Sequence, residues 1–183
     1  ARVEKTELKL LEHSLEIWSA MLKAAGGKSF SELLGDGQPR RWAAELLRWA
    51  VGRSPHTLPA IVLAMVEKIP ALMPEAQRRA IELGQALRSE LSARLGSHGV
   101  MLYPPYASCA PPHYKPLMPP FNWVYTAIFN VLELPVTQVP LGLNADGVPL
   151  GVQVAASHGN DHLTIAVALE LERQFGGWVP PPN

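Results

Sequence analysis

Cysteine is almost absent from this sequence, since Cys109 is the one thiol among 183 residues. A single cysteine can neither form an internal disulfide nor supply the thiolate cage of a structural zinc site. The chain therefore depends on neither oxidation nor a metal for folding, and we expect it to bind no metal and no cofactor.

Net charge is absent as well, because 16 Lys and Arg residues balance 16 Asp and Glu residues. Proteins that bind nucleic acid use a basic surface to attract the phosphate backbone over long distances. The sequence thus argues against a nucleic-acid partner. The N-terminus has no signal-peptide pattern and no initiator methionine, so we expect a chain that starts inside a larger protein.

Long apolar runs are also missing. The most apolar stretch, residues 54–73, is interrupted by Pro59 and by the charged pair Glu67 and Lys68. It therefore falls short of the roughly 20 apolar residues that a membrane-spanning helix needs. The sequence predicts no transmembrane helix here, although this stretch could still lie on a membrane.

What the sequence does contain is a hydrophobic content of 48%, enough to bury a real core. Residues 1–96 form a helical region. Apolar residues from Leu8 to Leu22 recur at steps of three and four, and Gly26 and Gly27 end this first helix. The pattern repeats in residues 42–49, and a third, more hydrophobic helical segment follows at 53–68. The polar, Ala- and Glu-rich stretch 74–95 predicts a long, partly exposed helix.

Residues 97–120 have a different character. "VMLYP" has the length of a strand, and the seven prolines between Pro104 and Pro120 forbid regular structure in the loop that follows. A loop of this length in a compact domain is usually functional or is pinned across a larger surface.

Residues 121–177 have the clearest secondary-structure pattern of the chain, and they predict the order helix, strand, hairpin turn, strand and helix. The strands are expected at 136–142 and 148–156, buried on both faces, and Asn160 or Asp161 caps the last helix, which ends at Gly176. Two or three strands leave the edges of a sheet unpaired, so we expect further strands outside this chain. The predicted fold class is α/β, with a mostly helical N-terminal half.

One polar cluster, "SHGNDH", places Ser157, His158, Asp161 and His162 within six residues. Hydrolytic triads draw their members from separate parts of a fold, so a strand-to-helix turn explains this cluster better. His158 and His162 have the spacing of metal ligands on a helix, but no third ligand stands nearby.

The remaining candidates have equally plain interpretations. Cys109 and His113 resemble a nucleophile and its base, yet the proline-bounded loop fixes neither, and a structural thiol is the better interpretation. The scattered glycines form no phosphate-binding pattern. The tryptophans at positions 18, 42 and 49 have the spacing of core residues rather than of a stacking platform.

Several stretches in combination carry a resemblance. They are "FN" at 121–122, "N…LP" at 130–135, "VPLGL" at 139–143, "DGVPLGVQV" at 146–154 and "NDHLTIAVALELE" at 160–172. Together they resemble the C-terminal part of the amidase signature family of serine hydrolases. Further stretches, among them "LRWAVGRSPHTLPAIVLAMVE" and the ending "FGGWV", extend the similarity over nearly the whole chain, toward the members of the family that act on fatty-acid amides.

The resemblance implies a mixed β-sheet flanked by helices and a Ser–cis-Ser–Lys triad with backbone N–H groups that hold the oxyanion. The triad belongs to a Gly/Ser-rich signature with an upstream Lys, and neither occurs in this sequence: "GGKS" at 26–29 lacks the serine-rich continuation. We therefore assign no catalytic, cofactor-binding or metal-binding residue. The chain is expected to supply scaffold and walls of an acyl channel, and not to hydrolyse amides alone.

The implied parent protein hydrolyses primary fatty-acid amides and N-acylethanolamines to fatty acid and amine, and is membrane-associated and intracellular. Its partners are the fatty-acid amide substrate and a membrane surface. Two alternatives stay open: a general or tRNA-linked amidase of the same family, and a non-catalytic lipid-binding or interaction protein. Residues 54–73 are expected at the mouth of the acyl channel or on a membrane-facing cap, with an ordinary core helix as the other interpretation.

One departure from the family stands out. Relatives tend to carry Gly where "NVLELP" has Glu133, directly after a helix, where a chain often passes through left-handed backbone space. Only Gly does so freely, so we predict a strained backbone at Glu133.

Overall fold

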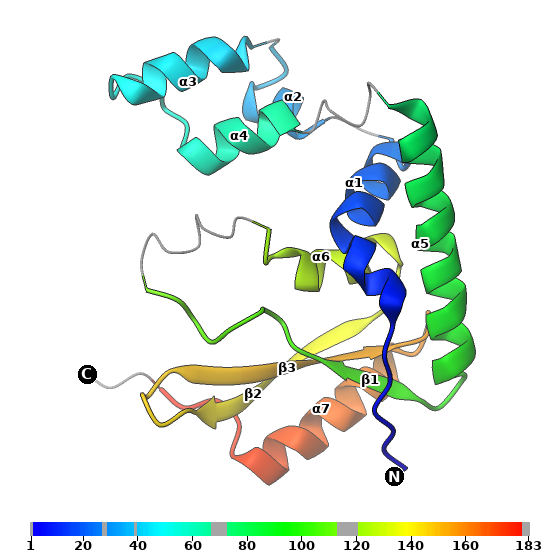
Figure 1. Ribbon diagram of the computed structural model, residues 1–183. Coiled ribbons are helices and arrows are strands. Elements are labelled where there is room, and N and C mark those ends of the chain that lie inside the picture. Colours follow the sequence, from blue (N-terminus) through cyan, green and yellow to red (C-terminus); the bar gives the residue numbers. More distant parts are fainter. Residues whose placement is uncertain (1, 27–28, 39, 67–72, 113–120, 181–183) are drawn as a thin grey trace. The chain divides into compact units, whose positions relative to one another are not determined.

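The computed structural model describes residues 2–26, 29–38, 40–66, 73–112 and 121–180. Regular structure comprises eleven elements in these residues (Figure 1): η1 (Lys9–His13), α1 (Ser14–Ala24), α2 (Phe30–Leu34), α3 (Trp42–Ala50), α4 (Leu58–Val66), α5 (Pro74–Leu95), β1 (Val100–Tyr103), α6 (Val124–Val131), β2 (Val136–Leu143), β3 (Pro149–Ala156) and α7 (Asp161–Phe175). The chain divides into two compact units, residues 19–82 and the remainder.

The larger unit is built on a three-stranded antiparallel sheet with the order β1-β3-β2. Successive side chains of a strand point to opposite faces. On one face Val139 and Val154 pack against Ala168 of α7, and these three residues are buried. Helix α6 lies on the other face (Figure 1). Gln153 and its register partner Tyr103 point to that face, since the Gln153 side chain donates to the Tyr125 carbonyl of α6. Helices thus cover a sheet, which confirms the predicted α/β class.

Two strand predictions have different outcomes. The inner half of β3, Gln153 to Ala156, is buried on both faces, as expected. β2 is not, because it is an edge strand and only Val139 along it is fully buried. The prediction of two doubly buried strands is therefore wrong for β2.

The buried face of the first helix is shifted from the predicted one, because Leu15, Trp18 and Met21 of the predicted face are only partly buried. Ile17 is fully buried, whereas Leu22 is 49% exposed. Trp18 is half-buried and meets the edge of the Trp123 ring, with the ring centroids 4.5 Å apart and the planes at 72°. This contact joins α1 to the N-terminal end of α6, since Trp123 is the residue before that helix.

The last helix begins differently from the prediction. Asn160 stands at the N-cap position, but its backbone (φ −98°, ψ 38°) is not extended, and its side chain makes no cap hydrogen bond. An N-cap side chain reaches the free N–H groups from an extended backbone, so this geometry excludes capping by Asn160. Buried Thr164 instead donates to the Asp161 carbonyl and lies 2.8 Å from the Thr137 hydroxyl of β2. Gly176 ends the helix at φ 85°, as predicted.

The smaller unit contains α2, α3 and α4, with α2 and α3 packed against α4. Helix α2 starts with a capping box between Ser29 and Glu32. In α3, Trp42 is buried against His56, with ring centroids 5.5 Å apart. Trp49 in the last turn is 41% exposed, so the prediction of a core tryptophan is confirmed at 42 and wrong at 49. A nine-residue helix has under three turns, and the buried positions here lie in its first half.

The carboxylate of Glu45 joins α3 to the segment that leads into α4. Glu45 is 6% exposed, and it accepts hydrogen bonds from Ser54 Oγ at 2.9 Å and from Arg48 at 3.3 Å. Burial of a charge is costly unless the group is paired and hydrogen-bonded, and both conditions hold here. The Glu45 carboxylate therefore stabilises the packing of α3 against the segment that leads into α4.

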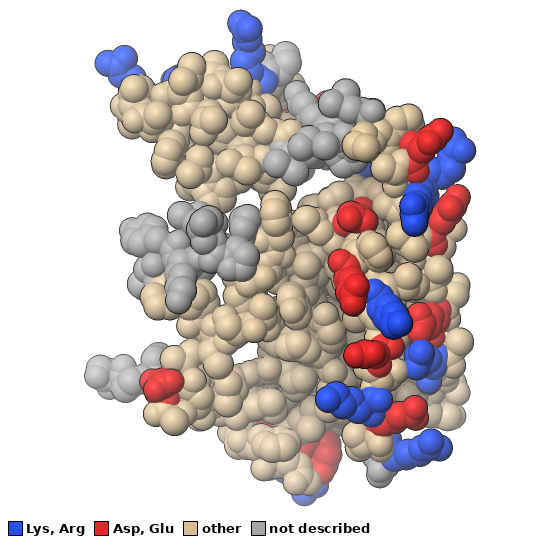
Figure 2. All heavy atoms as spheres, viewed as in Figure 1, with Lys and Arg blue, Asp and Glu red and all other residues tan. Residues whose placement is uncertain are grey.

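Helix α5 follows the predicted bounds, 74–95. Its polar character is visible at the surface, where acidic and basic side chains gather over this helix (Figure 2). None of the helices in the described ranges is both long and apolar enough to cross a membrane.

Candidate functional site

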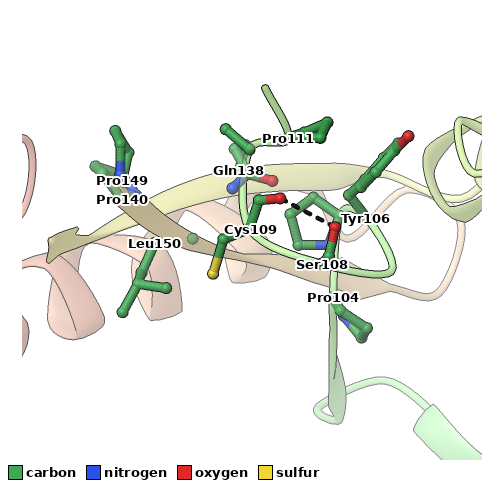
Figure 3. Close-up of a pocket in the computed structure, with 12 residues that line it drawn as sticks. Pro104, Tyr106, Ser108, Cys109, Pro111, Gln138, Pro140, Pro149 and Leu150 are labelled. Atoms are coloured by element: carbon green, nitrogen blue, oxygen red, sulfur yellow. Dashed lines mark hydrogen bonds between the residues drawn. The ribbon is translucent and has the colours of Figure 1, made fainter. Parts of the chain in front are cut away.

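A pocket of about 650 Å³ lies between the proline-rich loop after β1 and the outer part of the β2–β3 hairpin. The loop contributes one wall and the hairpin the other (Figure 3). Its twelve lining residues are Pro104, Pro105, Tyr106, Ser108, Cys109, Ala110, Pro111, Gln138, Pro140, Pro149, Leu150 and Gly151. None of them carries a formal charge, so the pocket suits an apolar or neutral group better than an ion.

The hairpin wall is shaped by its turn. Asn144 Oδ1 accepts hydrogen bonds from the backbone N–H groups of Asp146 at 2.9 Å and Val148 at 2.8 Å. Gly147 completes the turn at φ 73°, a left-handed conformation that glycine adopts without strain. The hairpin turn predicted between the two strands is thus confirmed, at residues 144–147.

Gly151 lines the floor of the pocket and has no side chain to fill it. Gly151 pairs with Pro140 in the strand register, and a Cβ added at Gly151 would collide with Nε2 of Gln138, two residues before Pro140 on β2. Glycine at 151 therefore leaves room for the Gln138 side chain to lie over the sheet. Gln138 is otherwise exposed, and its amide is the polar group of this part of the pocket.

The loop wall contains Cys109, whose thiol is free and exposed. Asn144 Nδ2 lies 3.9 Å from Cys109 Sγ, and the Ser108 hydroxyl donates to the Cys109 carbonyl at 3.0 Å (Figure 3). His113, the expected base in the alternative that makes Cys109 a nucleophile, lies outside the described residues.

The "SHGNDH" cluster forms a strand-to-helix turn, as the plain interpretation predicts. Ser157 Oγ is shielded from solvent and has no hydrogen-bond partner among the residues that the structure describes. Nδ1 of His158 lies 2.9 Å from the carbonyl oxygen of Glu133, while Asp161 and His162 are exposed at the start of α7. Within the described ranges, no three His, Cys, Asp or Glu side chains are placed to hold a metal ion.

Above the sheet, Tyr103 of β1 lies in an aromatic group with two residues of α6. Its ring stacks on Tyr125 and meets the edge of Phe129, each with ring centroids 5.6 Å apart. Burial raises the pKa of the Tyr103 hydroxyl, and the neighbouring Tyr125 raises it further. These rings fix the position of α6 against the end of β1.

Gln153 is the polar residue of the site that sequence reasoning missed. It is 3% exposed, and its Nε2 donates to the carbonyls of Pro104 and Tyr125, both at 3.1 Å. The one signal in the sequence was its place in "GVQ", part of the amidase resemblance, but that motif does not reveal which groups the amide contacts.

With this geometry established, comparison with known proteins places the chain in a family. The family model described as Amidase matches residues 1–165. The chain belongs to the amidase family, which confirms the resemblance seen in the sequence.

Individual relatives narrow the similarity. The chain is 46% identical over 187 aligned residues to fatty-acid amide hydrolase 2 of Homo sapiens, and 44% identical to fatty-acid amide hydrolase 2-A of Danio rerio. These alignments cover 99% and 98% of this chain but 35% of each relative. The chain thus spans about a third of the length of the curated relatives it matches.

Solved structures show the same fold. A glutamyl-tRNA(Gln) amidotransferase structure from Thermotoga maritima matches 99% of this chain and 38% of its own, with a TM-score of 0.63 and 19% identity. 6-Aminohexanoate cyclic dimer hydrolase matches 96% of this chain and 43% of its own, with a TM-score of 0.51 and 18% identity. At these identities the likeness concerns the fold.

Proposed function

We propose that this chain is part of an amidase that hydrolyses fatty-acid amides, namely primary amides and N-acylethanolamines, to fatty acid and amine. The observation that carries the proposal is the 46% identity to fatty-acid amide hydrolase 2 over 99% of the chain. In this proposal the chain is one portion of a single amidase domain, with a helical region at 1–96, a strand and loop at 97–120 and a core at 121–177. It provides scaffold and part of the acyl-binding wall, and the Ser–Ser–Lys triad comes from elsewhere in the protein.

The pocket supports an acyl substrate on physical grounds. Its lining residues are uncharged, and five of them are proline. An alkyl chain gains free energy from each methylene that leaves water, about 0.8 kcal/mol when fully buried. An uncharged pocket of about 650 Å³ falls in the size range of small-molecule sites, so we place part of the acyl chain here.

The exposed residues of the smaller unit support the proposal that the substrate comes from a membrane surface. Helix α3 and the residue after it expose Leu47, Trp49 and Val51, and α4 exposes Val62 and Met65. The charged residues between 40 and 66 are four arginines and Glu45, and that glutamate is buried. Exposed apolar side chains beside basic ones are typical of helices that lie on anionic lipid.

The test is the chain-length dependence of hydrolysis by the full-length protein. We expect oleamide and oleoylethanolamide to be hydrolysed, and kcat/KM to rise with acyl length by up to about fourfold per buried methylene. Turnover that does not depend on acyl length indicates a general amidase. Acyl binding without turnover, and without labelling by a fluorophosphonate probe, indicates a non-catalytic lipid-binding protein.

A further inference from the structure

Gln153 occupies an unusual place for a polar side chain. It lies in the central strand of the sheet and is 3% exposed. A buried amide costs free energy unless its donors find acceptors. The –NH₂ group has two N–H donors, and the two acceptors at 3.1 Å satisfy both.

The two acceptors lie at opposite ends of one segment. Pro104 is the first residue after β1, and Tyr125 is the second residue of α6. They stand 49 and 28 positions away from Gln153 in the sequence. The Gln153 side chain thus contacts Pro104, where the loop leaves the sheet, and Tyr125, at the start of the next helix.

The loop wall has few other attachments. Among the described residues 104–112, the other hydrogen bond to a separate segment is the contact between Asn144 Nδ2 and Cys109 Sγ, which is long at 3.9 Å. The Ser108 bond to Cys109 stays within the loop. The prolines have no N–H to donate. Pro104 and six further residues of this loop nevertheless line the pocket. The shape of the pocket therefore depends on the position of the residue at which the loop starts.

The aromatic group around Tyr103 is the rival anchor. Tyr103 pairs with Gln153 in the strand register, and its ring contacts Tyr125 and Phe129. Ring contacts hold β1 and α6 together, but they make no bond to the Pro104 carbonyl. The amide of Gln153, unlike the rings, contacts the Pro104 carbonyl, where the loop leaves the sheet.

We propose that Gln153 is a positioning residue, which ties both ends of the proline-rich segment to the sheet and so holds the loop wall of the pocket in place. Loss of the amide leaves two carbonyls without this donor, and the loop samples other positions. If the pocket takes the acyl chain, a mobile wall weakens substrate binding and leaves the chemical step unchanged.

The variants are Gln153→Met, which removes the amide and keeps the length of the side chain, and Gln153→Glu, which turns carboxylate oxygens toward the two carbonyls. Gln85→Met and Gln85→Glu on the exposed face of α5 are the matched controls. A nitroxide label at Cys109, the one cysteine of this sequence, reports the motion of the loop. The full-length protein is used, with any further cysteine replaced by serine.

In the parent protein we expect a motionally restricted nitroxide spectrum. In Gln153→Met we expect a mobile component that grows roughly tenfold, the effect of losing two ordinary hydrogen bonds. The Gln85 variants should match the parent. A mobile label in the parent protein, or a restricted label in a folded Gln153→Met variant, overturns the proposal, and the first of these outcomes decides it even if both Gln153 variants fail to fold.

A kinetic measurement completes the test, and this measurement alone rests on the proposed function. We expect Gln153→Met to raise KM for oleamide by about tenfold and to leave kcat within about twofold. If the parent protein hydrolyses no amide, the proposed function fails, while the spectra still decide the role of Gln153. A mobile loop with unchanged KM overturns the link between Gln153 and substrate binding.

Discussion

Arg88 on α5 and Glu133, two residues after α6, form an ion pair with 2.7 Å between Nη2 and Oε2. The same glutamate has φ 55°, the left-handed backbone predicted for it from the sequence. Glu133 is thus strained in its backbone and paired through its side chain. Both side chains are partly exposed, at 37% and 60%, and ion pairs in such positions contribute about 0–1 kcal/mol.

We expect Glu133→Gly to stabilise the protein, because glycine relieves backbone strain of about 1 kcal/mol. The lost ion pair offsets part of this gain, so the melting temperature should rise by roughly 1–3 °C. Arg88→Ala is the control, since it removes the ion pair and leaves the strain, and it should change stability by under about 0.5 kcal/mol. A larger loss in Arg88→Ala than the gain in Glu133→Gly would show that the ion pair dominates at this position.

The outcome at Glu133 shows what sequence could and could not predict. Its backbone conformation could be predicted because relatives tend to carry Gly here and because a chain often passes through left-handed backbone space directly after a helix. The bounds of α5 follow from helix propensity summed over 22 residues. The partner of Glu133 could not be predicted in this way, because Arg88 lies 45 positions earlier and meets it only in the folded chain.

The site divides along the same line. The proline-rich loop and the Asn144–Gly147 turn were evident because both depend on local residue types. The two acceptors of Gln153 are distant in sequence, and a buried glutamine looks like any polar residue in a strand. The absence of a cap hydrogen bond from Asn160 could not be predicted for a similar reason. The start of α7 is held by a contact between Thr164 and Thr137 of β2, which are distant in sequence, and the backbone of Asn160 departs from the extended form that local residue preference predicts.

A second prediction concerns the pocket. Leu150 lines it and is 37% exposed, whereas Leu169 on α7 is 61% exposed and lies outside it. Leu150→Asp puts a charge beside the proposed acyl chain, so KM for oleamide should rise at least about tenfold while KM for a short amide such as butyramide changes little. Leu169→Asp should leave both values as they are. Equal effects of Leu150→Asp on long and short amides would place the acyl chain elsewhere.

A third prediction concerns stretch 54–73, whose residues 67–72 lie outside the described part of the chain. In α4, Ile61 is fully buried, while Val62 is 40% and Met65 38% exposed. We expect Val62→Asp/Met65→Asp to remain folded by circular dichroism and to lose at least about tenfold in affinity for phosphatidylserine vesicles.

The matched change for this prediction is Ile61→Asp, which buries a charge and should unfold the smaller unit. Binding of the parent protein should also weaken between about 0.05 and 0.5 M salt, because arginine contacts to lipid are screened. If the double variant unfolds as Ile61→Asp does, α4 is an ordinary core helix, the other interpretation of this stretch. If the variant is folded and binds vesicles like the parent, the membrane surface lies elsewhere.

A fourth prediction follows from the raised pKa of Tyr103. The folded protein holds this hydroxyl neutral, first because burial disfavours the phenolate and second because of Tyr125. The stability from a raised pKa is complete below the unfolded-state value of 10.0 and is lost as pH rises through the higher folded-state value. Unfolding free energy should therefore fall as the pH rises above 10.0.

Tyr103→Phe should reduce that alkaline loss of stability, since phenylalanine keeps the ring contacts and has no proton to release. Urea unfolding at pH 9 and at pH 11 measures the difference between the two values for each protein. An unchanged slope in Tyr103→Phe would contradict the assignment of the alkaline loss to this hydroxyl.

The last prediction concerns the nucleophile. Two side chains of this chain are candidate nucleophiles, and within the described residues neither contacts an activating base. Ser157 Oγ is shielded from solvent and has no hydrogen-bond partner there, and Cys109 is a free, exposed thiol. His158, the histidine next to Ser157, has Nδ1 within 2.9 Å of the Glu133 carbonyl, so that contact ties the ring to the backbone. Covalent catalysis needs nucleophile, base and oxyanion donors in one unit, and loss of any member costs several orders of magnitude in rate.

We therefore expect Ser157→Ala to leave oleamide hydrolysis by the full-length protein within about twofold of the parent. Cys109→Ala alters a residue of the pocket wall, so its effect should fall on KM and leave kcat within about twofold. The 183-residue chain by itself should take up no fluorophosphonate and release no oleic acid, whereas the full-length protein should be labelled with a stoichiometry near one. Peptide mapping identifies the labelled serine, which should lie outside this chain. Stoichiometric label at Ser157, with activity abolished in Ser157→Ala, would overturn the assignment of this chain to scaffold and acyl-binding wall, because the nucleophile would then belong to the turn between β3 and α7.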